Sequence, residues 1–272
     1  MTGAARLLGW FGTAAIAIAA VPVSAQPAPD PEAIFARART IAEARVLPPY
    51  LEYTTYAAFI RKNHTDSEQL HVVVRTSDGA SYVTPMADSP GDQRDAKSYV
   101  QKSPPYFWPA TTFGLARSEK NDSQTFGRAS GAPPPEPPIR PSSLHDYTVK
   151  YRGTEMLGNA TVYHLILEPR DDPQTHQLRE AYIDTTSFQT RRLVAAVYEK
   201  NGPFHVQPRA VVDYAPIEET WLVSSGTVDF TLRFGPFAFS GTGVLRLNDV
   251  RAPSEEPDWM FDASKLAAHQ RG

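Results

Sequence analysis

The chain has 272 residues, with 27 Lys and Arg against 30 Asp and Glu, so its formal net charge at pH 7 is −3. This balance, without a local basic cluster, excludes the electrostatic footprint of a nucleic-acid-binding protein. The sequence contains no cysteine, which excludes disulfides, thiolate metal sites and a cysteine nucleophile. The fold must therefore rest on a hydrophobic core, which a chain of this length can build.

The first 25 residues have the three parts of a secretory signal peptide. Arg6 supplies the positive charge, the stretch from Leu7 to Ala20 is uncharged and apolar, and Val23-Ser24-Ala25 ends it with small residues. The apolar stretch is shorter than the roughly 20 residues that span a bilayer. We therefore expect cleavage between Ala25 and Gln26, export to the periplasm, and a soluble single domain over residues 26–272.

A helix is expected directly after a short polar lead-in. Asp30 is a capping residue, Pro31 suits the first helical position, and Glu32 places a negative charge in the first turn. Pro48-Pro49 ends the helix. Its apolar positions recur at helical spacing: Ile34, Ala38, Ile41 and Ala42.

After the helix the hydrophobic period changes to two, which indicates β-strands. Strands are expected at 50–60 and 70–75 with a polar turn at 63–68, and Asp78-Gly79 predicts a hairpin. The aromatic, proline-broken segment 102–114 indicates irregular structure or a short helix. The segment 132–143 has six prolines in twelve residues and is a linker, a polyproline recognition motif or a long loop. We favour the loop, because both flanking halves have the same strand pattern.

The second half predicts a series of antiparallel strands. They are expected at 147–152, 160–167, 179–184 and 190–199, with turns at 153–159, 170–174 and 201–203. The most regular alternation comes last, where residues 227–234 and 237–248 flank a reversal at Gly235-Pro236. One side of this pair is apolar and the other polar, which is typical of an antiparallel sheet with one buried face.

These features predict a mainly β (α+β) fold: a strongly curved antiparallel sheet forming an incomplete barrel, with the N-terminal helix covering part of its apolar face. Gly241 and Gly243 lie on that face and leave room on it. The aromatic cluster around Trp108 either packs in the core or lines a cavity. The candidate ligand-binding residues are Val149, Tyr151, Val228, Phe230, Leu232, Phe234, Phe237, Phe239, Leu245, Leu247 and Trp108.

Catalytic and metal-binding motifs are missing from the sequence. The seven histidines lack ligand spacing, and no G-x-S-x-G, S-x-x-K, G-x-G-x-x-G or P-loop motif occurs. His164 lies within a predicted strand, where it is interpreted as a core or cleft histidine with a hydrogen-bond partner. The acidic pairs 171–172, 218–219 and 255–256 fall in turn contexts and are interpreted as solvated charges. We expect no enzymatic activity, no cofactor and no metal.

The segment Asp146–Arg192 resembles the periplasmic lipoprotein-carrier superfamily of the LolA, LolB and RseB type. The resemblance rests on Gly153 and Gly158, on Leu167-Glu168-Pro169, on Tyr182-Ile183-Asp184 and on Arg191-Arg192. The ending Pro257–Phe261 is also similar to endings in related exported proteins. The resemblance implies an incomplete barrel closed by helices around a cavity for acyl chains. Segment 132–143 has no counterpart in that pattern, and lid helices after the first are hard to find.

Four functions remain open from the sequence. The leading hypothesis is a periplasmic, monomeric protein that binds a lipid, an acylated protein or another apolar ligand in the concave face of the sheet. The alternative is an envelope-stress sensor of the same fold, which would signal to a membrane-bound partner. A cell-envelope hydrolase is the third, and it requires His164, a carboxylate and a hydroxyl to converge in one cleft. A purely structural role, with 133–141 as a docking strip, is a further possibility.

Overall fold

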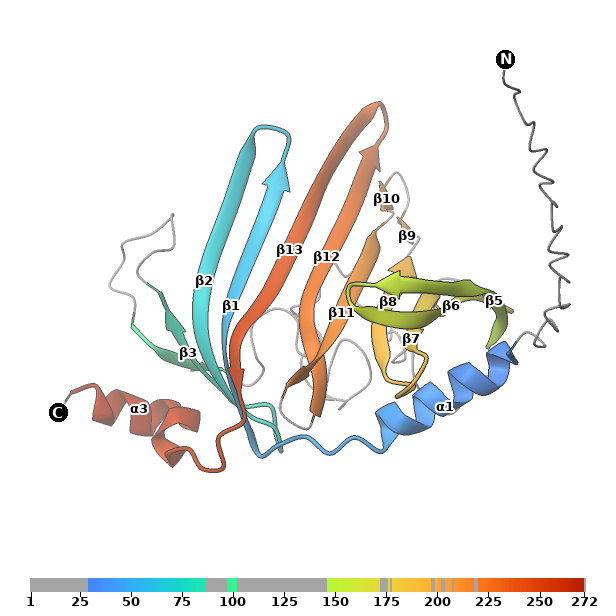
Figure 1. Ribbon diagram of the computed structural model, residues 1–272. Helices are drawn as coiled ribbons and strands as arrows, with labels where there is room; N and C mark the ends of the chain where they lie inside the picture. Colours follow the sequence, from blue (N-terminus) through green and yellow to red (C-terminus); the bar gives the residue numbers. More distant parts are fainter. Residues whose placement is uncertain are drawn as a thin grey trace, which may run out of the picture.

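Strands dominate the structure, as the two-residue periodicity predicts (Figure 1). The computed structural model describes residues 29–86, 97–101, 146–171, 176, 178–196, 199–201, 204–206, 208–217 and 220–271. The strands before the undescribed segment 102–145 are β1 (Tyr50–Arg61), β2 (His64–Arg75), β3 (Ser81–Pro85) and β4 (Tyr99–Gln101). Those after it are β5 (Tyr147–Leu157), β6 (Ala160–Pro169), β7 (Leu178–Asp184), β8 (Thr190–Ala196), β9 (Glu199–Asn201), β10 (Phe204–Val206), β11 (Arg209–Ile217), β12 (Thr220–Phe234) and β13 (Phe237–Arg251).

All these strands belong to one antiparallel sheet. Its main order is β4-β3-β2-β1-β13-β12-β11-β8-β7-β6-β5, and the short β9 and β10 attach beside β12. The last strand therefore pairs with the first, which joins the halves on either side of segment 102–145 in one sheet. The end strands β4 and β5 do not pair with each other, so the sheet stays open.

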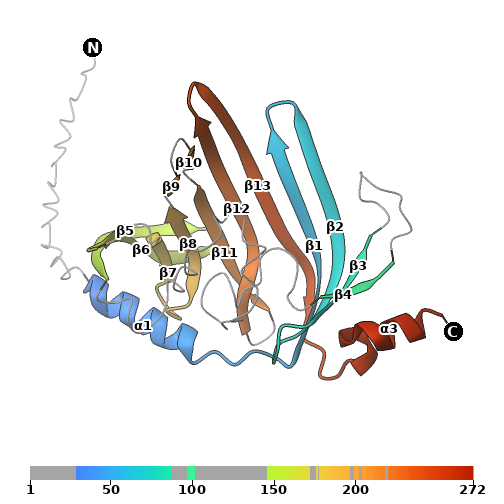
Figure 2. The same ribbon diagram turned by 180° about the vertical axis from the view of Figure 1, so that it is seen from behind.

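The sheet twists strongly along this order. In Figure 1, β12 and β13 run up the view whereas β5 and β6 cross it, and Figure 2 shows the same change of direction from behind. The β1–β2 and β12–β13 hairpins reach farthest from the helices in both views. The predicted fold class, a curved and incompletely closed antiparallel sheet, is confirmed.

One side of the sheet carries two clusters of buried apolar side chains. The first lies under α1 (Pro31–Glu43), which Asp30 caps by accepting the Glu32 N–H at 3.0 Å, so the predicted helix and its cap are confirmed. Ile34, Phe35 and Ala38 of α1 pack against β5, β6, β7, β8 and β11. The second cluster lies at the other end, on β1, β2 and β3 with one residue of β12, and consists of Leu51, Tyr53, Leu70, Val72, Val74, Val83 and Leu222.

The C-terminus adds two short helices that sequence periodicity does not reveal: the 3-10 helix η2 (Asp258–Phe261) and α3 (Ala263–His269). The ring of Trp259 lies edge-on to Tyr82 of β3 at 5.7 Å, and Phe261 stacks on Tyr50 of β1 at 5.6 Å. Tyr82 alternates with Val83, so these helices cover the opposite side of the sheet from the second apolar cluster. Seven residues are too few to display a helical period.

Two expected turns are shorter than the sequence suggests. The polar stretch 64–68 continues β2, because it pairs residue by residue with β1 down to Arg61 and His64, and only Lys62 and Asn63 turn. Residues 153–157 likewise extend β5, and the turn is confined to Gly158 and Asn159. In both cases the strand ends are solvent-exposed, so they carry no apolar alternation although their backbone ladder continues. The predicted reversals at Gly79 and Gly235 are confirmed, both with φ in the left-handed region.

Candidate functional site

The apolar side of the β12–β13 hairpin carries a row of side chains that is buried at one end and exposed at the other. The register pairs Val228 with Gly243, which places both strands' apolar positions on one side of the sheet. Leu245 is 4% exposed, whereas Phe239 and Phe237, closer to the hairpin turn, are 41% and 71% exposed. The row therefore leads from the core to solvent at the hairpin tip.

Two glycines, Gly241 and Gly243, interrupt this row. Gly243 pairs with Phe59 of β1, whose ring stacks on Phe239 with the ring centroids 6.5 Å apart. Within the described part of the chain, a Cβ added at Gly243 would meet only the Val228 carbonyl oxygen, at 3.8 Å, which is an ordinary contact. The sheet itself therefore does not require glycine there, and its absence of a side chain leaves space beside two aromatic rings.

The sequence-predicted binding residues fall into separate groups. Val149 is buried and Tyr151 partly buried, both in the cluster under α1, on a different part of the sheet from the β12–β13 row. Along that row Leu245 is buried, and Val228 and Leu247 are partly buried. The register places Phe230, Leu232 and Phe234 on the same side, although their side chains lie outside the described residues, as does all of Trp108.

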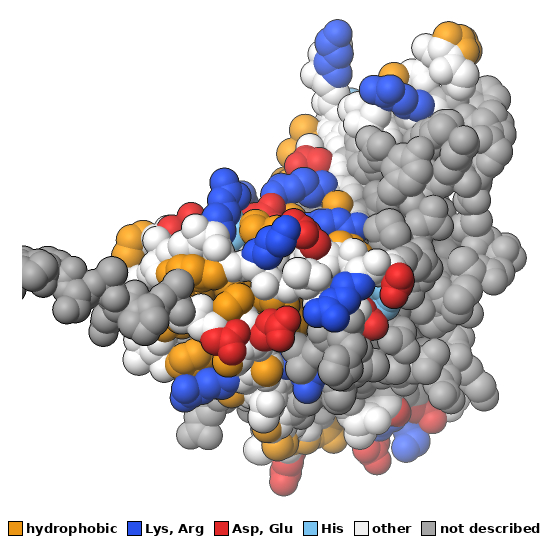
Figure 3. Space-filling model, turned by 90° about the vertical axis from the view of Figure 1, so that its right-hand side faces the viewer, with side chains coloured by type: hydrophobic (Ala, Val, Ile, Leu, Met, Phe, Trp, Pro, Cys, Tyr) orange, Lys and Arg blue, Asp and Glu red, His pale blue; other side chains and the backbone are white. Residues whose placement is uncertain are grey.

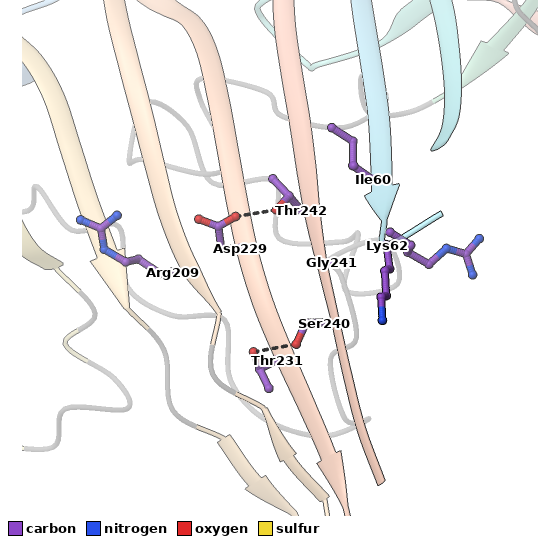
Figure 4. Close-up of a pocket in the computed structure, with 9 residues that line it drawn as sticks. Ile60, Lys62, Arg209, Asp229, Thr231, Ser240, Gly241 and Thr242 are labelled. Carbon is purple, nitrogen blue, oxygen red and sulfur yellow. Dashed lines mark hydrogen bonds between the residues drawn. The ribbon is translucent and has the colours of Figure 1, made fainter. Parts of the chain in front are cut away.

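A polar pocket of about 580 Å³ lies on the opposite side of the same hairpin (Figure 4). Asp229 and Thr231 of β12 alternate with the apolar row, and β13 pairs Thr242 and Ser240 with them. The Thr242 hydroxyl donates to Asp229 Oδ1 at 2.7 Å, and the Thr231 and Ser240 hydroxyls lie 3.2 Å apart. The lining residues are Ile60, Arg61, Lys62, Arg209, Asp229, Thr231, Ser240, Gly241 and Thr242.

Strict alternation in the sequence already placed the four polar residues of the hairpin on its polar side. It could not join them to Lys62, which comes from a turn far away in the sequence, or to Arg209, which lies on the preceding strand β11. Only the pairing of β1 with β13 and of β11 with β12 brings the two cations to one pocket. Local patterns therefore missed this site.

His164 lies farther along the polar side, and its predicted character as a hydrogen-bonded core or cleft histidine is confirmed. It is 4% exposed, its Nε2 lies 2.9 Å from a Glu180 carboxylate oxygen, and its ring stacks on Tyr182 at 4.2 Å. Burial raises the pKa of Glu180, but hydrogen bonds from Tyr182 and His164 and the charge of Arg209 outweigh it, so that pKa lies below its ordinary value. Burial and the bond to Glu180 raise the pKa of Tyr182 to about 12.

This cluster does not have the geometry of a hydrolytic site. The Tyr182 hydroxyl donates to the same Glu180 carboxylate at 2.8 Å instead of lying on the second imidazole nitrogen. That nitrogen, Nδ1 of His164, is buried without a hydrogen bond, with a Glu155 oxygen 3.5 Å away. A histidine covered in this way has no open side from which to activate a nucleophile.

Metal and membrane features were also searched in the described residues. Within these ranges no group of three or more His, Asp or Glu residues is placed to hold a metal ion. None of the helices described here is long and apolar enough to cross a bilayer. On the coloured part of the side shown in Figure 3, basic and acidic side chains are intermixed with apolar ones instead of forming a patch of one sign.

The fold is thus an open, twisted antiparallel sheet whose apolar side is covered in part by one helix. No family model matches the chain, and no curated protein matches it. Among solved structures, a DUF1329 family protein from Desulfovibrio piger is 13% identical over 88% of this chain and 100% of its own, with a TM-score of 0.38.

Two further solved structures are similar at the same identity. A LolA superfamily protein from Nitrosomonas europaea is 13% identical over 86% of this chain and 98% of its own, with a TM-score of 0.37. An outer membrane lipoprotein-sorting protein domain from Vibrio parahaemolyticus is 13% identical over 85% of this chain and 96% of its own, with a TM-score of 0.43. They include the superfamily that segment Asp146–Arg192 resembles, and what this chain does is inferred below from its own residues.

Proposed function

We propose that this protein binds an apolar ligand, an acyl chain of a lipid or of an acylated protein, along the apolar side of the β12–β13 hairpin. The observation that carries the proposal is the row from buried Leu245 to exposed Phe239 and Phe237, interrupted by two glycines. Large apolar side chains gathered on an exposed surface mark binding sites in soluble proteins. A ligand on this row would bury them.

The glycine gap gives the row a shape suited to a chain-like ligand. A flexible acyl chain could lie over Gly243 and contact the ring of its cross-strand neighbour Phe59, which stacks on the ring of Phe239. Each methylene removed from water contributes about 0.8 kcal/mol. A chain of several methylenes would therefore bind without needing a polar contact to hold it.

The proposal includes export. Residues 1–25 act as a cleaved signal peptide, and residues 26–272 work in the periplasm as a single, monomeric carrier-like domain. Lipids and acylated proteins are the apolar partners available in that compartment. The buried arrangement of His164 supplies no support for the hydrolase alternative. No contact among the described residues favours the sensor role over simple binding.

Filling the glycine gap tests the site. We expect Gly243→Phe to abolish binding of an acyl-chain probe such as a fluorescent fatty acid, because the new ring occupies the space next to Phe59. Lipid extraction and native mass spectrometry of the wild-type protein should show bound lipid, which the variant loses. Asn248→Phe is the matched control, because Asn248 is exposed on the polar side of the same strand.

The fold of each variant is checked by its melting temperature. Should Gly243→Phe fail to fold, Phe237→Ser keeps the test decisive, because Phe237 is 71% exposed and its loss removes apolar surface without opening the core. We expect this variant to bind the probe more weakly at an unchanged melting temperature. Wild-type protein that carries no lipid and ignores the probe contradicts the proposal.

A further inference from the structure

The polar pocket of the β12–β13 hairpin lies on the other side of the sheet from the apolar row, so the apolar-ligand proposal leaves it unexplained. It lies across four strands, with Arg209 on β11, Asp229 on β12, Ser240 on β13 and Lys62 just after β1 (Figure 4). Its volume of about 580 Å³ is within the range of small-molecule sites, roughly 300–1,000 Å³. It can therefore hold more than a single ion.

The lining has an excess of positive charge. Three cations, Arg61, Lys62 and Arg209, line the pocket together with one carboxylate, Asp229. The Arg61 guanidinium lies over the Phe59 ring, 5.4 Å from its centroid, so Lys62 and Arg209 are the cations left on the side of Asp229. That carboxylate already accepts the Thr242 hydroxyl at 2.7 Å, so part of its hydrogen-bonding capacity is used within the protein. A pocket with this balance favours an anion.

The cations differ in how far they are engaged by other residues. Arg61 forms a close pair with Asp66 at 2.7 Å. Arg209 reaches Glu180 only at 3.4 Å and its side chain is half exposed. Lys62, in the exposed turn, makes no ion pair with any residue that the structure describes. Among the described residues Lys62 is therefore the unpaired cation of the lining, and Arg209 would exchange its hydrogen bond to Glu180 on β7 for one to a ligand.

Between the two cations lie neutral donors. The Thr231 and Ser240 hydroxyls are 3.2 Å apart and bond only to each other among the described residues. Each hydroxyl can turn its proton toward a ligand oxygen. Cations on two sides with hydroxyl donors between them suit a group with several acceptor oxygens, and guanidinium groups bind phosphate oxygens in particular.

We propose that this pocket binds a phosphate ester, with Arg209 and Lys62 pairing with the phosphate oxygens and with Thr231 and Ser240 donating hydrogen bonds to them. The same chemistry is presented by a small soluble phosphoester and by the headgroup of an anionic phospholipid. The site is independent of the apolar row, because the two lie on opposite sides of β12 and β13.

Calorimetry and vesicle binding together test the site and its source of phosphate. In one arm the purified protein is titrated with glycerol 3-phosphate and, for comparison, with acetate. In the other arm it is sedimented with phosphatidylglycerol vesicles and with phosphatidylcholine vesicles. We expect glycerol 3-phosphate to bind more tightly than acetate if the ligand is soluble, or phosphatidylglycerol vesicles alone to bind if it is a headgroup. Higher salt should weaken either interaction.

Substitutions then locate the binding. Arg209→Gln and Lys62→Gln should each weaken it about tenfold or more, the usual effect of losing a charge-assisted hydrogen bond. Arg251→Gln is the matched control, because Arg251 is likewise exposed and reaches one carboxylate, Glu52, at 3.4 Å, but lies outside the pocket. Lys62 lies in an exposed turn, so its substitution leaves the fold intact even if that of Arg209 does not.

Two results overturn the proposal: neither probe binds, or Arg251→Gln weakens binding as much as the pocket variants do. Gly243→Phe separates this site from the apolar one. That variant should lose the fatty-acid probe and retain the phosphate probe, whereas Lys62→Gln should do the reverse. A loss of both ligands in both variants contradicts two independent sites.

Discussion

Asp184 stabilises the turn between β7 and β8 through one buried carboxylate. Its Oδ1 accepts the backbone N–H groups of Thr186 and Ser187 at 3.0 and 2.8 Å, and its Oδ2 accepts two hydrogen bonds from the Arg191 guanidinium at 3.0 and 2.7 Å. Burial alone would raise the pKa of Asp184, but these hydrogen bonds outweigh it, so the pKa lies below its ordinary value. The folded state therefore favours the ionised form of the Asp184 carboxylate.

The lowered pKa of Asp184 determines how its contribution to stability depends on pH. A carboxyl whose pKa is lower in the folded than in the unfolded chain stabilises the protein above the unfolded pKa, about 3.9, and loses that contribution as the pH falls through the folded pKa. We expect Asp184→Asn to lower the free energy of unfolding by about 1.5–3 kcal/mol near neutral pH, because the charge-assisted bonds to Arg191 are lost.

Urea unfolding of wild type and variant across the acidic range measures the effect. The difference between the two proteins should shrink as the pH falls below about 3.9, where the wild-type carboxyl also becomes protonated. The exposed Asp171 provides the control, and Asp171→Asn should leave stability within about 0.5 kcal/mol. A difference for Asp184→Asn that stays constant down to low pH would contradict the assignment.

The residues that carry the resemblance to the lipoprotein-carrier superfamily have structural roles of this kind. Ile183 is buried in the cluster under α1, and Asp184 holds the turn. Arg191 and Arg192 form ion pairs with Asp184 and Asp213, which connect neighbouring strands. These positions therefore specify how the strands join, and they say nothing about a ligand.

At the scale of elements, α1 depends on a few large contacts. Phe35 is almost fully buried between the helix and the sheet, beside Ile34 and Ala38. We expect Phe35→Ala to lower the free energy of unfolding by about 3–5 kcal/mol, because it removes the transfer free energy of the ring and leaves a cavity. Denaturant unfolding measures it. Thr40→Ala, on the exposed side of the same helix, should stay within about 0.5 kcal/mol, and an equal loss in both variants would contradict this packing.

The sequence predicts the elements that are long and have one buried, apolar face. The helix at Asp30, the β12–β13 pair and the turn at Gly235 follow from cap chemistry, alternation and a glycine in the left-handed region. The tip of the β1–β2 hairpin and the first residues after Gly153 could not be predicted, because their side chains face water on both sides. Backbone pairing alone extends those strands.

The two candidate sites also differ in whether the sequence could predict them. The apolar row could be predicted because its members are neighbours at a period of two along β12 and β13. The polar pocket could not, because Lys62 is brought beside β12 and β13 only by the pairing of β1 with β13, which are distant in the sequence, and Arg209 joins Asp229 through the register of the β11–β12 hairpin. Sequence alternation places a residue on a side of the sheet, and only strand order places it next to its partners.

At the scale of the whole molecule, the proposed signal peptide, residues 1–25, takes no part in the contacts of the folded domain used above. The cap of α1 is Asp30, and the residues that pack on the sheet begin at Ile34. Every contact used above to argue the apolar row and the polar pocket lies after residue 26. Removal of residues 1–25 should therefore leave both proposed sites intact.

Expression of residues 1–272 in a Gram-negative host tests the proposed signal peptide. We expect the periplasmic protein to have the mass of residues 26–272, because small residues at Val23 and Ala25 suit the signal peptidase. Ala25→Trp should block processing and leave the longer chain with the membrane, whereas Ser24→Trp, at the tolerant middle position, should still be cleaved. Full-length chain found folded in the cytoplasm would contradict export. A chain expressed from Gln26 should match the processed protein in melting temperature and in binding of the fatty-acid probe.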